Sequence, residues 1–219
     1  MTRLLRRPRV DPRVVYQVAS WCLDYPTAGL RERLPLLANA LAEQPRSREV
    51  TSLGAVIDHL ASTPLDRLQR AYVDVFDLSR KHALYLSYWT DGDTRRRGEV
   101  LGRFKTAYRR SGFLVDTRGE LPDYLPMVLE FAACADLSAG RELLLAYRPS
   151  LELLRIALQE RQSAYVGALV AVCATLPGES PADRAAVQAM VDAGRPPVES
   201  VGLDAYDPRL LPLQRVGER

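Results

Sequence analysis

The chain has 219 residues, of which 47% are hydrophobic and 26% charged, as in an ordinary globular domain with a sizeable core. This composition excludes a chain that is disordered throughout. The formal net charge is +3, but only Lys81 and Lys105 are lysines, so the positive charge is arginine scattered along the sequence. Such scatter argues against a dedicated polyanion surface, and we expect no nucleic-acid partner.

The cysteines and the N-terminus indicate the compartment. Cys22, Cys134 and Cys173 lie far apart among apolar neighbours, which predicts buried thiols in a reducing cytoplasm without a disulfide or a zinc site. The N-terminal residues contain paired arginines, but Asp11 and Pro12 follow before any apolar segment forms. We therefore expect residues 1–11 to be a basic arm and not an export signal.

Helical spacing of apolar residues begins at Asp11, which is placed to cap a helix that starts with Pro12 and ends near Tyr25. The same periodicity predicts a second helix, in which Pro35 indicates a kink or a later start. This second helix spans about 27–41, and further helices are predicted over about 47–61, 63–76, 94–110, from 123 onward, 139–162 with a break at Pro149, 162–178 and 180–194.

Several residues are placed to end or cap these helices. Thr63 should cap the helix that has Pro64 in its first turn, and Ser180 should cap the last helix, which Gly194 closes. Gly112 suits a left-handed helix end. The uncharged stretch 162–178 is too short for a bilayer and ends in Pro-Gly, so we expect a buried helix and no membrane insertion.

The predicted fold is all-α: a single compact bundle of about nine or ten helices over residues 12–194. Residues 195–219 are rich in proline and predict a loose tail. The sequence has no phosphate loop, dinucleotide fingerprint or metalloprotease motif, and neither His59 nor His82 stands in register with a carboxylate pair. We expect no catalytic residue and no metal site.

The segment "GELPDYLPMVLEF" at residues 119–131 combines three carboxylates with two prolines. Pro126 lacks an N–H and must lie in the first helical turn, which makes Asp123 the predicted N-cap, accepting from the Leu125 N–H. Glu130 then falls on an apolar face and needs a positive partner. We expect Arg97 to pair with Glu130 or Asp123, against the alternative that the neighbouring arginines point into water.

The same segment allows an alternative of a different class, which is a hydrolase that uses Glu120, Asp123 and Glu130 as its carboxylates. The two classes differ in what they require of these groups. A hydrolase predicts a cleft that holds a glutamate with a strongly raised pKa, whereas a scaffold predicts a paired, ionised glutamate.

The stretch "FDLSRKHALYLSYWTDGDTRRRGEVLGRFKTAYRRSGF" followed by "ELPDYLPMVLEF" resembles the assembly chaperones of respiratory nitrate reductase, the NarJ or delta-subunit family within the TorD-like chaperones of molybdenum enzymes. The resemblance is densest over residues 72–131. Its structural signature positions are Asp93, Arg95, Arg97, Gly98, Glu120, Pro122, Asp123, Pro126, Glu130 and Phe131.

The resemblance implies an all-helical, cytoplasmic chaperone without enzymatic activity. Such a protein binds the immature catalytic (alpha) subunit of nitrate reductase through that subunit's N-terminal segment and a second surface. It supports molybdenum cofactor insertion before membrane docking, holds no cofactor stably itself, and can meet cofactor-delivery proteins. A chaperone for a dimethyl sulfoxide or selenate reductase is the alternative within the same class.

Apolar and aromatic residues around the first signature block suit a groove that takes a partner's amphipathic segment. We predict that this segment contacts Tyr72, Phe76, Leu84, Tyr85, Leu86, Tyr88 and Trp89. For the same residues, plain core packing remains the alternative interpretation.

Overall fold

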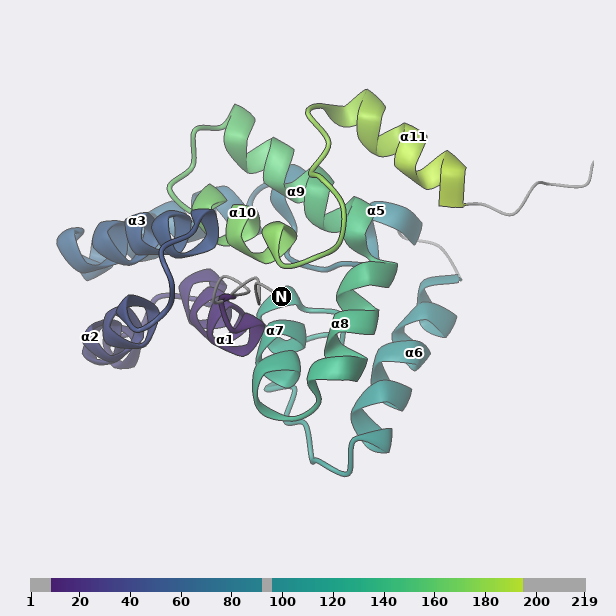
Figure 1. Cartoon of the computed structure of the whole chain (residues 1–219), viewed down its shortest axis with the longest axis horizontal. Helices are drawn as coiled ribbons and strands as arrows, with labels where there is room; N and C mark the ends of the chain where they lie inside the picture. Colours follow the sequence, from purple (N-terminus) through teal and green to yellow (C-terminus); the bar gives the residue numbers. More distant parts are fainter. Residues whose placement is uncertain (1–8, 92–95, 195–219) are drawn as a thin grey trace, which may run out of the picture.

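The computed structural model describes residues 9–91 and 96–194, and these residues are almost wholly helical (Figure 1). The α-helices are α1 (Pro12–Leu23), α2 (Ala28–Ala42), α3 (Arg48–Ser62), α4 (Leu65–Tyr72), α5 (Tyr88–Asp91), α6 (Arg96–Arg110), α7 (Leu125–Cys134), α8 (Leu137–Ala146), α9 (Arg148–Glu160), α10 (Val166–Ala174) and α11 (Arg184–Gly194). A π-helical turn, η1 (Val73–Asp77), continues α4, and a 3-10 turn, η2 (Arg80–His82), follows it. The predicted all-α fold is confirmed.

Local capping explains where the first helices begin. The Asp11 carboxylate accepts a hydrogen bond from the Arg13 N–H at 2.8 Å, and Pro12 follows at the start of α1 as predicted. Thr27 and Ser47 cap α2 and α3 through their hydroxyl oxygens. Pro35 lies inside α2, on its exposed face, without ending the helix.

Two predicted caps are wrong. Thr63 ends α3, where its N–H donates to the His59 carbonyl at 3.1 Å, and α4 begins after Pro64 without a side-chain cap. The last helix starts at Arg184 and not near Ser180, because the Asp183 carboxylate accepts from the Ala186 N–H at 2.8 Å. Thr63 therefore belongs to the end of α3, and Asp183 takes the capping role that was predicted for Ser180.

The loop that precedes α11 is held by α9, which explains the late start of that helix. Arg148 Nη2 donates to the carbonyl oxygens of Gly178 at 3.1 Å and Glu179 at 3.0 Å, and Arg155 Nη2 donates to that of Pro181 at 2.5 Å. Fully buried Glu152 balances part of this charge, with its Oε2 2.6 Å from Arg155 Nε. A buried pair that also satisfies backbone carbonyls fixes the loop in one conformation.

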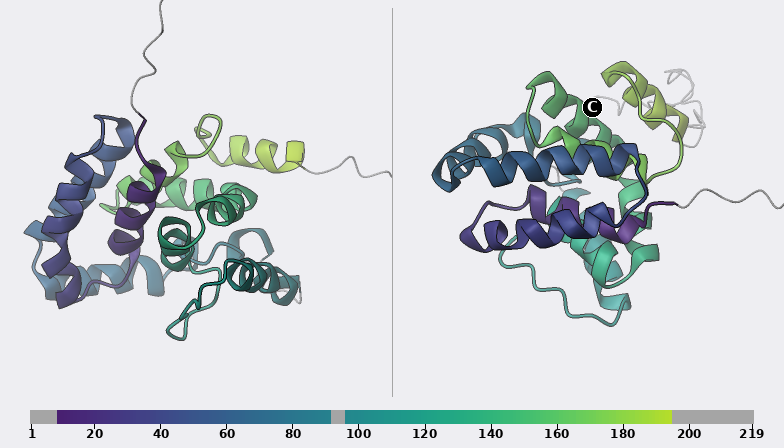
Figure 2. Two further views of the ribbon diagram at one scale, coloured as in Figure 1. Left: turned by 60° about the horizontal axis from the view of Figure 1, so that its bottom comes forward. Right: turned by 60° about the vertical axis from the view of Figure 1, so that its left-hand side comes forward.

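Helix α1 lies at the centre of the molecule. Its Ser20 hydroxyl donates to the Pro126 carbonyl of α7 at 2.8 Å, and its Tyr16 hydroxyl lies 2.8 Å from the Thr175 hydroxyl after α10. Figures 1 and 2 show α2 and α3 side by side along one flank of α1, and α6 on the far side of the molecule. Helix α1 therefore connects α7 on one side of the bundle with α10 on the other.

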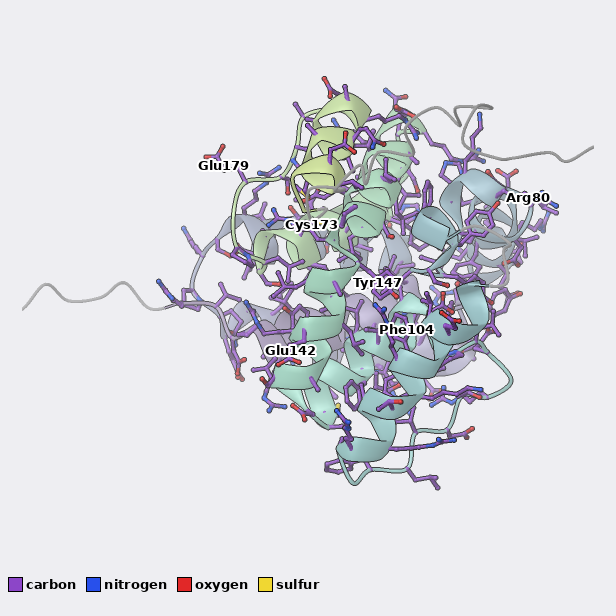
Figure 3. All side chains as sticks on the ribbon, turned by 90° about the vertical axis from the view of Figure 1, so that its right-hand side faces the viewer. Arg80, Phe104, Glu142, Tyr147, Cys173 and Glu179 are labelled. Atoms are coloured by element: carbon purple, nitrogen blue, oxygen red, sulfur yellow. The ribbon has the colours of Figure 1, made fainter. Side chains whose placement is uncertain are left out.

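Helix α6 is joined to the bundle by aromatic packing. The rings of Phe104 on α6 and Tyr147, between α8 and α9, lie 5.0 Å apart, and Figure 3 shows both side chains between these helices. Gly112 lies two residues after the end of α6 and has a φ of +77°, as predicted for a left-handed position. Within residues 9–91 and 96–194, no helix is long and apolar enough to cross a bilayer.

Candidate partner-binding site

Two signature segments that are distant in sequence meet through their backbones. Tyr85 and Tyr124 form an isolated antiparallel β-bridge. The Leu86 N–H donates to the Asp123 carbonyl at 3.1 Å, and the Leu125 N–H donates to the Leu84 carbonyl at 2.7 Å. We call this pairing of residues 84–87 with 120–125 the clasp.

Asp123 secures the clasp with its side chain. This residue is 0% exposed, and its Oδ2 accepts from both the Ser87 N–H at 3.0 Å and the Ser87 hydroxyl at 2.6 Å. The prediction that Asp123 caps the helix is wrong, because Tyr124 occupies the N-cap position of α7 and the Leu125 N–H is taken by Leu84. A fully buried carboxylate that accepts two hydrogen bonds is a structural anchor.

Contacts of Pro122 and Phe131 with Tyr108 of α6 fasten the clasp to the core. The Tyr108 hydroxyl donates to the Pro122 carbonyl at 2.6 Å, and the rings of Tyr108 and Phe131 lie 4.8 Å apart. Pro126 stands in the first turn of α7, as its missing N–H requires, and this part of the prediction is confirmed.

A cavity of about 250 Å³ lies beside the clasp. It is rich in tyrosines and carboxylates, and its lining residues are Asp24, Tyr25, Tyr72, Phe76, Asp77, Leu84, Tyr85, Glu120 and Tyr124. We call it the acidic cavity, because three of these residues are carboxylates and none is basic.

Hydrogen bonds between the tyrosines fix the wall of the acidic cavity. The Tyr72 hydroxyl donates to the Leu23 carbonyl at 3.0 Å and lies 3.0 Å from the Tyr124 hydroxyl, which donates to Asp24 Oδ1 at 3.3 Å. The Tyr85 hydroxyl donates to Glu120 Oε2 at 2.5 Å. The wall is therefore polar at its surface and rigid.

The negative charge of the acidic cavity comes from carboxylates alone. Burial raises the pKa of Tyr72, Tyr85 and Tyr124 well above the ordinary phenol value, so their hydroxyls stay neutral. Helix α1 ends at Asp24, so the negative end of its dipole adds to the carboxylate charge. The cavity thus presents neutral aromatic rings together with an uncompensated negative potential.

The seven residues predicted to contact a partner are divided by the structure. Tyr72, Phe76, Leu84 and Tyr85 line the acidic cavity. The others do not line it: Leu86 is buried in the core, and Tyr88 and Trp89 are half-buried on α5. Trp89 Nε1 donates to the Ala83 carbonyl at 3.0 Å, which ties α5 to the segment just before the clasp.

The arginine-containing signature positions lie mostly outside the residues whose side chains the structure describes. Asp93 and Arg95 lie in the gap, and Arg97 belongs to α6 without a described side chain, so its ion pair stays a prediction. Gly98 lies in α6 with open space around it. Among the described basic side chains, none forms an ion pair with half-buried Glu130.

The three carboxylates of the hydrolase alternative do not converge. Glu120 lines the acidic cavity, whereas Glu130 lines a separate cavity of about 310 Å³ and Asp123 is buried in the clasp. Over residues 9–91 and 96–194, no group of three or more histidine, cysteine, aspartate and glutamate side chains could hold a metal ion. Cys134 is exposed, against the prediction of a buried thiol, and its Sγ lies 2.6 Å from Gln17 Oε1.

Sequence reasoning missed four residues of the acidic cavity, which are Asp24, Tyr25, Asp77 and Tyr124. Asp24 ends α1, and Asp77 ends the π-helical turn η1. A carboxylate at the C-terminal end of a helix is electrostatically unfavourable. This signal alone does not single out the cavity residues, because α9 also ends in a carboxylate, Glu160, which does not line the cavity.

Comparisons with known protein sequences identify the family of the chain. A profile of the family described as "Nitrate reductase delta subunit" matches residues 26–171. The chain is 42% identical over 165 residues to the nitrate reductase-like protein NarX of Mycobacterium tuberculosis H37Rv, covering 74% of this chain but only 24% of that protein. It is 34% identical over 167 residues to the probable nitrate reductase molybdenum cofactor assembly chaperone NarJ of Bacillus subtilis, covering 76% and 90%.

A third relative is the nitrate reductase molybdenum cofactor assembly chaperone NarJ of Escherichia coli K12. The identity is 32% over 151 residues, which cover 68% of this chain and 63% of that protein. The family match over residues 26–171 includes both segments of the clasp.

Proposed function

The chain belongs to the nitrate reductase delta subunit family, and on this premise we propose that it is an assembly chaperone for the catalytic subunit of a nitrate reductase. The names of its NarJ relatives support this proposal. The protein binds the immature subunit in the cytoplasm, supports insertion of the molybdenum cofactor before the subunit docks at the membrane, and catalyses no reaction itself.

The acidic cavity is the observation that carries the proposal. The described residues present a rigid, charged and aromatic cavity next to the segments that carry the family resemblance. Tyr25 at its mouth is 42% exposed, and Asp77 and Glu120 are also exposed there. Such a cavity is accessible to a segment of another chain.

The chemistry of the acidic cavity selects a segment that carries a basic residue. Aromatic faces pack against the apolar stem of an arginine or a lysine, and carboxylates accept hydrogen bonds from its charged end. We assign the cavity to the N-terminal segment of the client, bound as an amphipathic helix with one basic side chain inserted. The client leaves after assembly, so its affinity for one segment is in the micromolar range, about 8 kcal/mol.

A second surface contacts the body of the client. The loop between α6 and α7 exposes Phe113 at 57% and Leu114 at 99% of their surfaces, beside the cavity that Met127 and Glu130 line. Adjacent, large apolar side chains at such exposure mark an interaction surface.

Affinity capture from cells grown on nitrate tests the client. The tagged protein should retain a large molybdenum-enzyme subunit, and metal analysis of that subunit should show less than stoichiometric molybdenum. Capture of a dimethyl sulfoxide or selenate reductase subunit instead would select the other client class. Absence of any such subunit, with the tagged protein folded, would contradict the proposal.

Titration of a synthetic client N-terminal peptide tests the site. The double variant Asp77→Asn/Glu120→Gln should bind the peptide at least roughly tenfold more weakly, because each charged hydrogen bond contributes about 1.5 kcal/mol or more. The control Glu32→Gln/Asp58→Asn removes two exposed carboxylates that do not line this cavity. Equal affinity in both variants would show that the peptide binds elsewhere.

A further inference from the structure

A cavity of about 760 Å³ lies at the opposite end of α1 from the acidic cavity. Arg9, Arg46 and Arg141 line it, together with Glu49. We call it the basic cavity, and we propose that it binds a small phosphorylated molecule with an organic body, of the size and chemistry of a nucleotide. This inference does not depend on the identity of the client.

Charge is the first argument for a phosphorylated ligand. Three arginines against one glutamate give the lining a net charge of +2. None of the three arginines forms an ion pair with a described carboxylate. Arg9 and Arg46 are exposed and Arg141 is half-buried. The planar fork of an arginine side chain matches the oxygens of a phosphate, and guanidinium groups without an ion pair keep that capacity for a ligand.

Helix ends strengthen the positive potential. Pro12 at the start of α1, Ser47 at the start of α3 and Leu137 at the start of α8 all line the basic cavity, and α10 ends there at Ala174. Each N-terminal end carries a partial positive charge, which the capping carboxylates of Asp11 and Asp136 partly offset at α1 and α8, so the helix ends contribute less than the arginines. The backbone and the side chains therefore favour the same sign of ligand.

One arginine is held in place by a buried hydroxyl pair. Tyr16 is 0% exposed, and its hydroxyl lies 2.8 Å from the Thr175 hydroxyl and accepts from Arg141 Nη1 at 3.4 Å. Arginine carries five N–H donors, so this contact orients the guanidinium and leaves donors for a ligand. A guanidinium positioned in advance loses less conformational entropy when it binds.

The uncharged residues that line the basic cavity are the reason to expect an organic group on the phosphorylated ligand. Pro12, Pro45 and Pro177 line the cavity with Leu137 and Leu176. Rigid apolar walls suit a planar ring system, and a volume of several hundred cubic ångströms is typical of small-molecule sites. Inorganic phosphate alone would leave these walls without a partner, so the ligand is a phosphorylated molecule with a ring and not a free anion.

Equilibrium titration of the full chain with AMP, adenosine and pyrophosphate at low ionic strength tests the proposal. AMP should bind most tightly, pyrophosphate more weakly and adenosine least, and added salt should weaken AMP binding. Undetectable AMP binding at millimolar concentration, or equal binding of AMP and adenosine, would overturn the proposal. Equal binding of AMP and pyrophosphate would overturn the role given to the walls.

Variants locate the site. Arg46→Ala/Arg141→Ala should weaken AMP binding at least tenfold, whereas Arg67→Ala removes an exposed arginine outside the cavity and should leave it unchanged. Circular dichroism of each variant controls for folding. The client peptide should bind the double variant with wild-type affinity, so failure here is separable from failure of the proposed chaperone function. Equal losses in the Arg67→Ala variant and the double variant would contradict the assignment.

Discussion

The acidic and basic cavities lie at the two ends of α1, which at 12 residues is roughly 18 Å long. Carboxylates surround its C-terminal end at Asp24, and arginines surround its N-terminal end at Pro12. Each set has the sign that its end of the helix dipole already carries, so neither is neutralised by the helix. The comparison shows that unpaired charge has been concentrated at two places, which suits two ligands of opposite charge.

The two cavities are also built differently. The acidic cavity depends on the clasp, in which residues 84–87 pair with residues 120–125. The basic cavity depends on where helices begin and end, and on how closely α3 and α10 pack. A substitution that disrupts one cavity should leave ligand binding at the other cavity unchanged, and the following variants test this independence.

The largest effect is expected from Gly167→Ala on α10. A Cβ atom at Gly167 would lie 2.3 Å from the Ser52 carbonyl oxygen of α3, so the two helices must move apart. We expect the free energy of unfolding to fall by about 3 kcal/mol. Urea denaturation measures it, and AMP binding should weaken with it.

The matched control is Gly54→Ala on α3, where nothing lies within 4 Å of an added Cβ. This change should stabilise the protein by up to about 1 kcal/mol, because alanine favours the helix. A neutral result for Gly167→Ala would mean that the α3 to α10 contact is not tight.

A smaller loss is expected from Asp123→Ala in the clasp. Both hydrogen bonds to Ser87 disappear, which should lower the free energy of unfolding by about 2 kcal/mol. Peptide binding at the acidic cavity should weaken while AMP binding at the basic cavity stays the same. Parallel loss of both ligands would show that the cavities are not independent.

Acidification should affect the side of the molecule that holds the clasp. Burial lowers the pKa of His82, just before Leu84, and the charges of Arg161 and Lys81 act in the same direction. The unfolded chain therefore binds this proton more readily, so stability is full above about pH 6.5 and falls below it, by at most about 1.4 kcal/mol per pH unit.

Chemical denaturation between pH 7.5 and pH 5.5 measures this dependence, and values near these limits avoid the titration of ordinary carboxylates, about pH 4. The variant His82→Gln should lose most of the slope. An unchanged slope in that variant would assign the dependence to another group.

The smallest effect is expected from Tyr85→Phe. The lost hydrogen bond to Glu120 is exposed to solvent on the carboxylate side, so stability should fall by about 1 kcal/mol or less. Tyr25→Phe is the matched control, because Tyr25 lines the same cavity and no described group accepts from its hydroxyl. Thermal unfolding of the two variants should differ by this hydrogen bond alone.

Local signals predicted most of the fold correctly. Asp11 with Pro12 begins α1, Pro126 lies in the first turn of α7, and Gly112 takes a left-handed conformation. Each of these depends on the backbone chemistry of one or two neighbouring residues. Such signals are readable from sequence because no distant residue is needed to satisfy them.

Tertiary contacts account for what the sequence could not show. Asp123 has the chemistry of an N-cap, but Ser87 and Leu84, more than thirty positions earlier, take its carboxylate and the helix N–H. The basic cavity collects Arg9, Arg46 and Arg141 from three separate regions. Their scatter along the chain argued against a polyanion surface, whereas the fold brings these three to one small cavity.

One double titration tests the central claim most directly, using the client N-terminal peptide and AMP on the wild type, Asp77→Asn/Glu120→Gln and Arg46→Ala/Arg141→Ala. The account predicts that the carboxylate variant loses affinity for the peptide only, and that the arginine variant loses affinity for AMP only. Loss of both ligands in either variant, or of neither ligand in both, would contradict two sites of opposite charge at the ends of α1.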